Sequence, residues 1–328
     1  MVDILVLNSN DVASILSMKD VISLVENAFR EKGLGRVQMP PKVYLFFSRY
    51  DGDLRAMPAY FEGLDIAGVK IVNSHPMNPT RYGLPTVMAV IYLVDPRGGR
   101  PLCIMDGTLI TGMRTGGAAG VATKYLGRRD SRIVGIIGAG FLARFHLEAF
   151  TNVISVERVK IYDVIRSKAE DFAKRYSSIY GIDIEVANDV REAVYGVDVL
   201  ATLTPSREPI VRNEWVSEGM HINAMGADAP GKEELDPDIL RRAKIVVDDM
   251  EQAIHSGEIN VPISRGIIRR EDIYGELGEI VAGIKPGRTS DREITIFDST
   301  GLAIQDIIVA WHVYREAEKR GIGRIISL

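Results

Sequence analysis

The pattern of apolar and polar positions changes near residue 131 and divides the chain into two regions. In the first region, apolar runs bounded by Gly, Pro or Asp predict strands, and helically spaced apolar residues predict helices. Ser17 is a suitable N-cap for one such helix, and Gly33 is a suitable end. The strands predicted here are 4–7, 42–47, 54–61, 67–73 and 84–95, and the helices are 17–33 and 108–127.

From residue 131 onward, apolar strands alternate with helical segments. Such alternation is typical of a doubly wound parallel sheet, so we predict an α/β Rossmann domain here. An amphipathic helix over 301–323 closes the chain. The strands predicted for the parallel sheet are 132–138, 158–163, 182–188, 197–205, 220–228, 244–249 and 293–301.

Lys70 lies inside the predicted strand 67–73, with apolar residues on both sides. A lysine in this pattern belongs most often to an edge strand, with its ammonium group in water. The alternative is a lysine held among apolar groups or beside other cations. Its pKa can then fall from about 10.4 towards roughly 7–8, where the amine can move protons. The strand pattern alone leaves both interpretations open.

The bulk composition is that of a globular protein without a basic surface. The 328 residues are 46% hydrophobic and 26% charged, with a net charge of −4, and this length suits two domains. The sequence has no basic block that suggests nucleic acid and no window with the roughly 18 apolar residues of a membrane helix. The single cysteine, Cys103, fits a reducing compartment, so we expect a cytoplasmic protein. The histidines lack metal-ligand spacing, and we predict no metal site.

A glycine motif follows the first strand of the second region. Gly138-x-Gly140-x-x-Ala143 stands between an apolar strand and a helix, and Asp163 ends the next strand. This arrangement is the dinucleotide-binding fingerprint in its required context. Asp163 would accept hydrogen bonds from the adenosine ribose and repel a 2′-phosphate. We therefore predict NAD rather than NADP, although Arg166 lies close enough to keep NADP an option.

Cations recur near the apolar strands of the first region and in the helix 108–127, which is rich in small residues. Beside an NAD site and with few acids nearby, they indicate an anionic substrate such as a carboxylate. These residues are Lys42, Arg55, Lys70 and Arg114.

Several segments together resemble the ornithine cyclodeaminase/μ-crystallin family. The most specific are "VNSHP" (72–76), "MRTG" (113–116), "NAMGAD" (223–228) and "DSTG" (298–301), and the likeness runs almost end to end. The resemblance implies a substrate and dimerisation domain formed by 1–122 with 304–328, and an NAD-binding Rossmann domain over 123–303.

The resemblance also implies roles for particular residues. Lys70 and Asp228 match catalytic positions, and Lys42, Arg55 and Arg114 match substrate-binding positions. The residues that match cofactor contacts are Arg114, Thr115, Ala139, Gly140, Asp163, Gly226 and Ser299, beside Gly138 and Arg166 from the fingerprint.

Within the family, the sequence looks most similar to the archaeal-type alanine dehydrogenases. This likeness implies NAD-dependent, reversible oxidative deamination of L-alanine to pyruvate and ammonia. In the ornithine-specific pattern, the position of Arg55 is acidic and serves the second amine of ornithine, which Arg55 would repel. The alternatives are ornithine cyclodeamination, reduction of a cyclic ketimine such as pyrroline-2-carboxylate, and NADP-dependent binding of a small ligand as in μ-crystallin.

The first region also contains long apolar runs, above all "VMAVIYLV" (87–94). Such runs would serve either a sheet that continues across a two-fold axis or an internal sheet that is covered on both faces. We predict a homodimer with a small amino-acid or keto-acid substrate, and no nucleic-acid or membrane partner.

Overall fold

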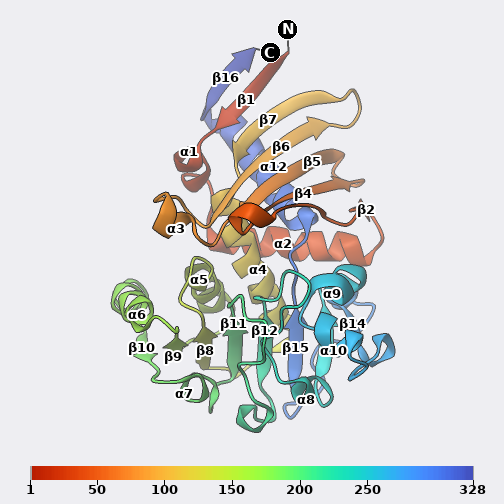
Figure 1. Cartoon of the computed structure of the whole chain (residues 1–328). Helices are drawn as coiled ribbons and strands as arrows, with labels where there is room; N and C mark the ends of the chain where they lie inside the picture. The colour runs from red at the N-terminus through yellow and green to blue at the C-terminus, as the bar shows by residue number, and fades with distance from the viewer. Residues whose placement is uncertain (1, 328) are drawn as a thin grey trace. The chain divides into compact units, whose positions relative to one another are not determined.

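A computed structural model describes residues 2–327, which form two compact units (Figure 1). Unit 1 contains the chain up to Arg114 and again from Leu302 onward, and unit 2 contains Thr115–Gly301. The predicted domain boundaries, 122/123 and 303/304, fall a few residues further along the chain. None of the described helices is long and apolar enough to cross a membrane.

Unit 1 is built on a mixed sheet, sheet A, with the strand order β16-β1-β7-β6-β5-β4-β2, and β3 also pairs with β4. All of its strand pairs are antiparallel except β1 with β7. The strands are β1 (Asp3–Leu7), β2 (Val37–Gln38), β3 (Val43–Phe47), β4 (Gly52–Phe61), β5 (Ile66–Ser74), β6 (Val87–Asp95), β7 (Arg100–Asp106) and β16 (Arg324–Ser327).

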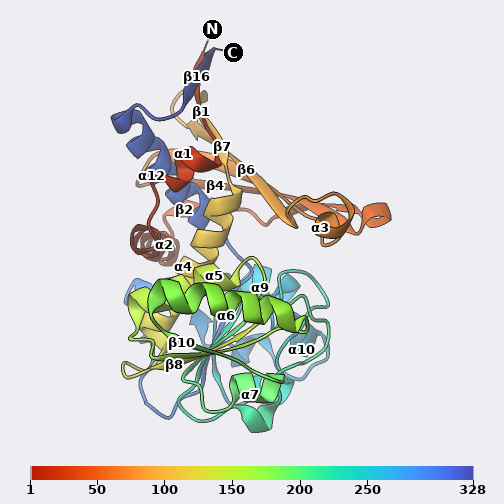
Figure 2. The same cartoon turned by 90° about the vertical axis from the view of Figure 1, so that its left-hand side faces the viewer.

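One face of sheet A is covered by the long helix α12, which also packs against α2 (Figures 1 and 2). The N-cap of α2 is Ser17, whose hydroxyl accepts a hydrogen bond from the backbone N–H of Asp20, as the sequence predicted. The helices are α1 (Ser9–Ala13), α2 (Met18–Gly33), α3 (Asn78–Arg81), α12 (Ala303–Arg320) and the start of α4 (Thr108–Leu126), which continues into unit 2.

Unit 2 is built on an all-parallel sheet, sheet B, with the strand order β10-β9-β8-β11-β12-β15-β13-β14. The order reverses between β8 and β11, which is the switch point where such sheets bind ligands. The strands are β8 (Ile133–Ile137), β9 (Arg158–Tyr162), β10 (Asp183–Val186), β11 (Val199–Thr202), β12 (His221–Ala224), β13 (Lys244–Val247), β14 (Gly275–Glu276) and β15 (Thr295–Asp298). Every residue of β11, β12 and β15 is buried, as expected for central strands covered on both faces.

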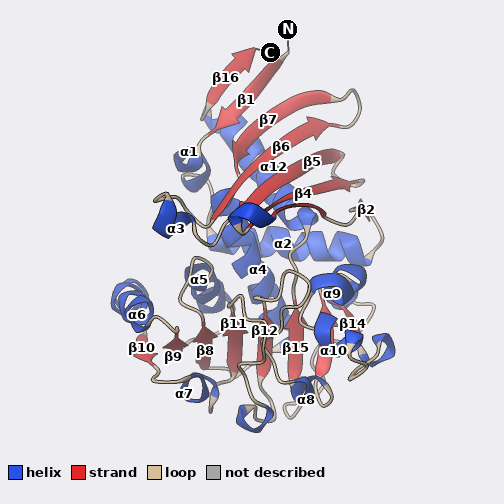
Figure 3. Cartoon of the chain, in the orientation of Figure 1, coloured by secondary structure: helices blue, strands red, loops and turns tan. Residues whose placement is uncertain are grey.

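Helical segments occupy the connections between the strands of sheet B (Figure 3). A Cβ on Gly116 of α4 would lie 2.6 Å from the backbone carbonyl carbon of Phe145, so glycine lets α4 pack closely against α5. The helices are α5 (Ala143–Val153), α6 (Arg166–Tyr180), α7 (Val190–Val194), α8 (Pro237–Leu240), α9 (Met250–Ser256), α10 (Asn260–Ser264) and α11 (Leu277–Val281).

The predicted α/β fold with a doubly wound parallel sheet is confirmed, and each strand predicted from the sequence overlaps an observed one. The edge-strand interpretation of Lys70 is wrong, because β5 lies between β4 and β6. The pattern did not reveal β7, where Pro101 weakens the strand signal, or the short strands β2, β14 and β16.

Candidate active site

The register of sheet A places Arg55 and Lys70 on the same face of the sheet. Met57 of β4 lies opposite Lys70, and Arg55 lies opposite Val72. Residues directly opposite each other project to the same side, and side chains along one strand alternate. Arg55 and Lys70 therefore share the face that packs against α12.

Lys70 is fully buried and belongs to a group of polar side chains that we call the lysine cluster. Its Nζ lies 2.7 Å from an Oδ of Asp306 in the first turn of α12. The other Oδ of Asp306 accepts a hydrogen bond of 3.0 Å from Nε of Arg114, and Gln305 Oε1 accepts one of 2.9 Å from Arg114 Nη1. The lysine cluster thus consists of Lys70, Arg114, Gln305 and Asp306, all from unit 1.

The surroundings of Lys70 lower its pKa from 10.5 to about 7. Burial contributes most, because removal from water disfavours the charged form, and the positive charge of Arg114 comes next. Asp306 opposes both effects, and Lys42 adds a further lowering. A lysine with this pKa exchanges its proton near neutral pH, as acid–base catalysis requires.

Arg55 is held by a partner that the sequence analysis did not single out. Its Nε and Nη2 donate to the two carboxylate oxygens of Asp53 at 2.9 and 3.0 Å. Its guanidinium carbon also lies 5.4 Å from the ring centroid of Tyr44. Both contacts fix the direction of a side chain that is mostly buried.

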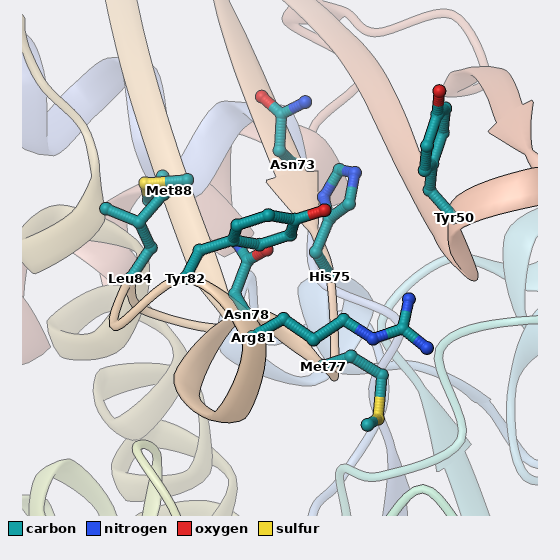
Figure 4. Close-up of a pocket in the computed structure, with 9 residues that line it drawn as sticks. All are labelled: Tyr50, Asn73, His75, Met77, Asn78, Arg81, Tyr82, Leu84 and Met88. Atoms are coloured by element: carbon teal, nitrogen blue, oxygen red, sulfur yellow. The ribbon is translucent and has the colours of Figure 1, made fainter.

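A separate hollow of about 500 Å³ is lined in part by Asn73 of β5. Side chains along a strand alternate between the two faces, so Asn73 and Lys70 project to opposite faces of sheet A. The hollow therefore lies by the face opposite Lys70. Figure 4 shows the side chains of Asn73, His75, Arg81 and Tyr82 around it. The ring of His75 stacks on Phe47, with 5.8 Å between centroids. The hollow is thus distinct from the lysine cluster. Its lining residues are Tyr50, Asn73, His75, Met77, Asn78, Arg81, Tyr82, Leu84 and Met88.

The glycine motif of unit 2 forms the turn between β8 and α5. Gly138 has φ +101°, which disfavours any other residue. A Cβ on Gly140 would meet no atom within 4 Å, so the space above this residue is open. The turn therefore fits a pyrophosphate at the N-terminus of α5, where backbone N–H groups favour an anion.

Asp163 follows β9 and braces the same turn. One carboxylate oxygen accepts the N–H of Ala139 and the other accepts the N–H of Ile165, both at 2.8 Å. The guanidinium of Arg166 donates to Glu170 at 2.8 Å and to Asn188 at 3.1 Å. Arg166 is therefore already paired, as expected of a site that does not select a 2′-phosphate.

Buried carboxylates support the loops at the carboxyl ends of the strands of sheet B. Glu234 accepts the N–H of Thr204 at 2.8 Å and that of Gly226 at 3.0 Å, and so links the loops after β11 and β12. Asp248 accepts the hydroxyl of Ser299 at 3.0 Å and the N–H of Gly301 at 2.7 Å, and so shapes the loop after β15. Two predicted cofactor residues are thus positioned by buried carboxylates: Gly226 by Glu234 and Ser299 by Asp248.

Two further carboxylates continue this arrangement, and we call all four the carboxylate network. Glu258 accepts the N–H of Glu234 at 2.8 Å and that of Leu235 at 2.7 Å. Asp298 accepts the N–H of Glu258 at 2.9 Å. The network consists of Glu234, Asp248, Glu258 and Asp298, all fully buried.

Burial raises the pKa of three members of the carboxylate network. It raises the pKa of Asp298 to about 8 and that of Glu258 well above its usual value, and the charge of Glu234 adds to the effect on Glu258. The pKa of Glu234 is raised as well, again by burial. Within residues 2–327, the structure has no group of three or more His, Cys, Asp or Glu side chains arranged to hold a metal ion.

Two remaining candidate residues also belong to unit 2. Asp228, in the loop after β12, pairs with Nζ of Lys232 at 2.6 Å. Thr115 is buried on α4. The structure thus gathers Lys70 and Arg114 in one unit and places Asp228 and Thr115 in the other.

Sequence reasoning missed the residues that hold the candidate side chains, above all Asp306, Asp53 and Glu234. Asp306 is the one charged residue in the apolar stretch 302–311 at the start of the last predicted helix, and this charge is the signal that could have identified it. Asp53 stands two positions before Arg55 and looks like a turn residue. Glu234 lies in a charged stretch that is typical of a solvated surface, and nothing in that stretch indicates its burial.

Comparison with known proteins gives matches over nearly the whole chain. The sequence profile described as "Ornithine cyclodeaminase/mu-crystallin family" matches residues 2–321. Alanine dehydrogenase of Archaeoglobus fulgidus is 53% identical over 98% of this chain and 98% of its own. A solved archaeal alanine dehydrogenase dimer with bound NAD is 52% identical and covers 99% of both chains with a TM-score of 0.95.

A second solved structure is equally similar in fold by TM-score. The Δ1-pyrroline-2-carboxylate reductase of Thermococcus litoralis, in complex with NADH and L-proline, is 43% identical with a TM-score of 0.95. The match covers 98% of this chain and 99% of that one. The fold is therefore shared by proteins that are named for different substrates.

Proposed function

Because the chain belongs to the ornithine cyclodeaminase/mu-crystallin family, as its motifs predicted, we propose that it is an alanine dehydrogenase. The reaction is L-alanine + NAD⁺ + H₂O → pyruvate + NH₄⁺ + NADH + H⁺, and it is reversible. The observation that carries the proposal is the buried lysine cluster beside Arg55 on one face of sheet A.

The cofactor and the enzyme class are shown by the relatives of the chain. Relatives that span the chain include dehydrogenases and reductases, and solved structures of this fold hold NAD or NADH. The protein is an NAD-dependent amino-acid dehydrogenase in this broader sense, and both predictions are confirmed. The substrate and the roles of the individual residues belong to the proposal.

Arg55, Lys42 and Arg114 bind the substrate carboxylate in this proposal. Asp306 and Gln305 engage Nε and Nη1 of Arg114, so Nη2 is the group that Arg114 offers to a carboxylate. Arg55 has no acceptor atom for a second ammonium group, which favours a substrate with one amine.

Lys70 acts as the proton acceptor. NAD⁺, which the glycine turn of unit 2 would hold, would supply the acceptor for the hydride of Cα, and loss of that hydride would make the substrate a protonated imine. Lys70 takes the proton that the substrate amine must lose before this transfer. Asp228 removes a proton from the water that adds to the imine carbon, and ammonia then leaves as the carbonyl forms. Lys232 Nζ donates a hydrogen bond of 2.6 Å to the Asp228 carboxylate and so fixes its position.

Reduction of a cyclic imine is the second candidate function. The Thermococcus litoralis reductase has the same fold at 43% identity, and its structure contains L-proline. A cyclic imino acid presents one carboxylate and one nitrogen, so the same cations would serve it. Lys70 would then have the opposite task of supplying a proton.

The test is absorbance at 340 nm in parallel wells. NADH formation from NAD⁺ and L-alanine, with pyruvate as product, is the expected result. NADH consumption with Δ1-pyrroline-2-carboxylate and none with pyruvate plus ammonia would replace the proposal by the second candidate. Ammonia and proline from L-ornithine without net NADH would instead identify a cyclodeaminase.

Unit 1 is, in the same proposal, the substrate and dimerisation domain of a cytoplasmic homodimer. The face of sheet A opposite Lys70 carries apolar side chains that are 37–59% exposed, and the archaeal alanine dehydrogenase of the same fold is a dimer. Such a patch is typical of an interface. The exposed side chains are Val43, Leu45, Ile71, Val90 and Ile104.

Val90→Glu should convert the dimer to monomers, because it buries a charge in the middle of this face. Sedimentation velocity measures the change. Ile179→Glu, on the exposed side of α6, is the matched control and should leave the dimer intact. A dimeric Val90→Glu variant would exclude this face as the interface.

A further inference from the structure

The first turn of α12 ends in a carboxylate that contacts both cations of the lysine cluster. One Oδ of Asp306 lies 2.7 Å from Lys70 Nζ, and the other accepts the hydrogen bond from Arg114 Nε at 3.0 Å. Asp306 is fully buried, so water does not compete for either contact. A single side chain thus sets the separation between Lys70 and Arg114.

The charges of the cluster do not cancel while Lys70 is protonated. Lys70 and Arg114 together carry two positive charges against the single negative charge of Asp306. Arginine does not lose its proton in proteins, so the surplus charge can leave only from Lys70. Once Lys70 is neutral, Asp306 and Arg114 remain as a balanced buried pair, which is the less costly state in a region of low dielectric.

We propose that Asp306 is a positioning residue that holds Lys70 Nζ against Arg114 and, through its charge, decides the pH range in which Lys70 accepts a proton. This inference rests on the proposed function of Lys70 and gives that side chain its partner. Gln305 completes the arrangement, since its Oε1 accepts Arg114 Nη1 at 2.9 Å and also the backbone N–H of Leu302 at 3.3 Å.

The groups that act on Lys70 come from three segments. Arg114 from α4 and Lys42 from the segment before β3 favour the neutral amine, whereas Asp306 from α12 favours the ammonium. Burial is the largest influence and also favours the neutral amine. Removal of the Asp306 charge therefore leaves only influences that lower the pKa of Lys70.

Asp306→Asn is the direct test because it keeps the size of the side chain and removes its charge. In the deamination direction, activity rises with pH as Lys70 loses its proton. We expect the acidic limb of the kcat/KM profile to move down by about one pH unit or more. The pKa of the substrate amine is the same for both enzymes, so the difference between the profiles reports the enzyme. An unmoved limb, or one that moves up, would overturn the proposal.

A second readout does not depend on turnover. With ¹³C-labelled lysine, the NMR signal of Lys70 is assigned from the spectrum of Lys70→Arg, and its titration is followed in the whole enzyme. The midpoint should fall in Asp306→Asn. If alanine is not a substrate but the midpoint falls, the role of Asp306 stands and the proposed function fails. If alanine is turned over but the midpoint is unchanged, only the role of Asp306 fails.

Asp306→Glu keeps the charge and lengthens the side chain, so it separates position from charge. The pH limb should stay near that of the parent enzyme, while kcat falls at least about tenfold because Nζ is displaced. This variant also serves if Asp306→Asn does not fold. Full kcat in Asp306→Glu would show that position is unimportant and would contradict the positioning role.

Discussion

The lysine cluster of unit 1 and the carboxylate network of unit 2 both bury charged groups, but they satisfy them in different ways. In the lysine cluster, a carboxylate pairs with two cations at 2.7 and 3.0 Å. In the carboxylate network, Glu258 and Asp298 accept hydrogen bonds from backbone N–H groups. Both groups are buried, so the contrast lies in the partners and not in the exposure.

A backbone N–H needs an acceptor oxygen but not a negative charge. Burial raises the pKa of Asp298 to about 8 and that of Glu258 well above its usual value, so the charged form of both carboxyls is disfavoured. In the lysine cluster, the pKa of Lys70 falls to about 7, and its proton is exchangeable there. Under the proposed function, the carboxylate network supports the loops predicted to bind the cofactor, and the lysine cluster carries the proton transfer.

The largest expected effect comes from removal of the amine in the lysine cluster. Lys70→Ala should lower kcat by about 10²–10⁴-fold, which is the usual contribution of a general acid–base group. NAD binding, measured by isothermal titration, should persist because the glycine turn belongs to unit 2. Lys70→Arg should be equally inactive, since a guanidinium keeps its proton.

Lys160→Ala is the matched control for this loss. Lys160 is also a strand lysine, and its Nζ donates only to the backbone oxygen of Tyr195 at 2.8 Å. This variant should retain near-parental kcat. A fully active Lys70→Ala enzyme would remove the basis for treating the lysine cluster as chemical machinery.

The next effect concerns the stability of the carboxylate network. It distinguishes the contribution of the carboxylate's charge from the contribution of its acceptor oxygens. Glu258→Ala leaves the N–H groups of Glu234 and Leu235 without their acceptor, at a cost of about 1–3 kcal/mol each. Glu258→Gln should lower the free energy of unfolding much less. Oε1 alone accepts the N–H of Leu235 and the shorter of two bonds from the N–H of Glu234, and the amide oxygen of glutamine can accept both. The free energy of unfolding in urea at pH 7 measures both variants. Equal losses in the free energy of unfolding for Glu258→Ala and Glu258→Gln would show that the N–H groups need the charge of Glu258 and not only an acceptor oxygen.

The sequence predicted most of the fold because its patterns are local. The strands of unit 2 are continuous apolar runs, and the dinucleotide fingerprint between β8 and α5 joins two elements at one turn. The Lys70 strand was harder, since edge and interior strands can have the same alternation. Its interior position follows from pairing with β4 and β6, which no local pattern encodes.

The candidate residues themselves were named by motif resemblance, but the groups that control them were not. Asp306 is separated from Lys70 by most of the chain, and only tertiary packing brings α12 onto β5. Likewise, Glu258 and Asp298 look like ordinary acids in their segments, and their raised pKa values arise from burial. Charge environments depend on distances in space, so they follow from the structure and not from spacing in the sequence.

A smaller effect is expected at Asp163, a carboxylate that resembles the carboxylate network in one respect and the lysine cluster in another. Like the carboxylate network, it accepts backbone N–H groups, from Ala139 and Ile165, both at 2.8 Å. Like the lysine cluster, it is proposed to act through its charge, by repelling a 2′-phosphate. Asp163→Asn removes that charge at constant size. The ratio of kcat/KM for NAD to that for NADP should fall about tenfold, equivalent to about 1.4 kcal/mol.

Glu170→Gln tests the same NAD to NADP preference through Arg166, the cation that could bind a 2′-phosphate. It frees the guanidinium of Arg166 from an exposed pair at 2.8 Å, and such pairs are worth only about 0.2–1 kcal/mol. Its effect on the NAD to NADP ratio should therefore be smaller than that of Asp163→Asn and in the same direction. If Asp163→Asn leaves the ratio unchanged, the turn discriminates by its shape, and Asp163 belongs with the acceptor-only carboxylates of unit 2.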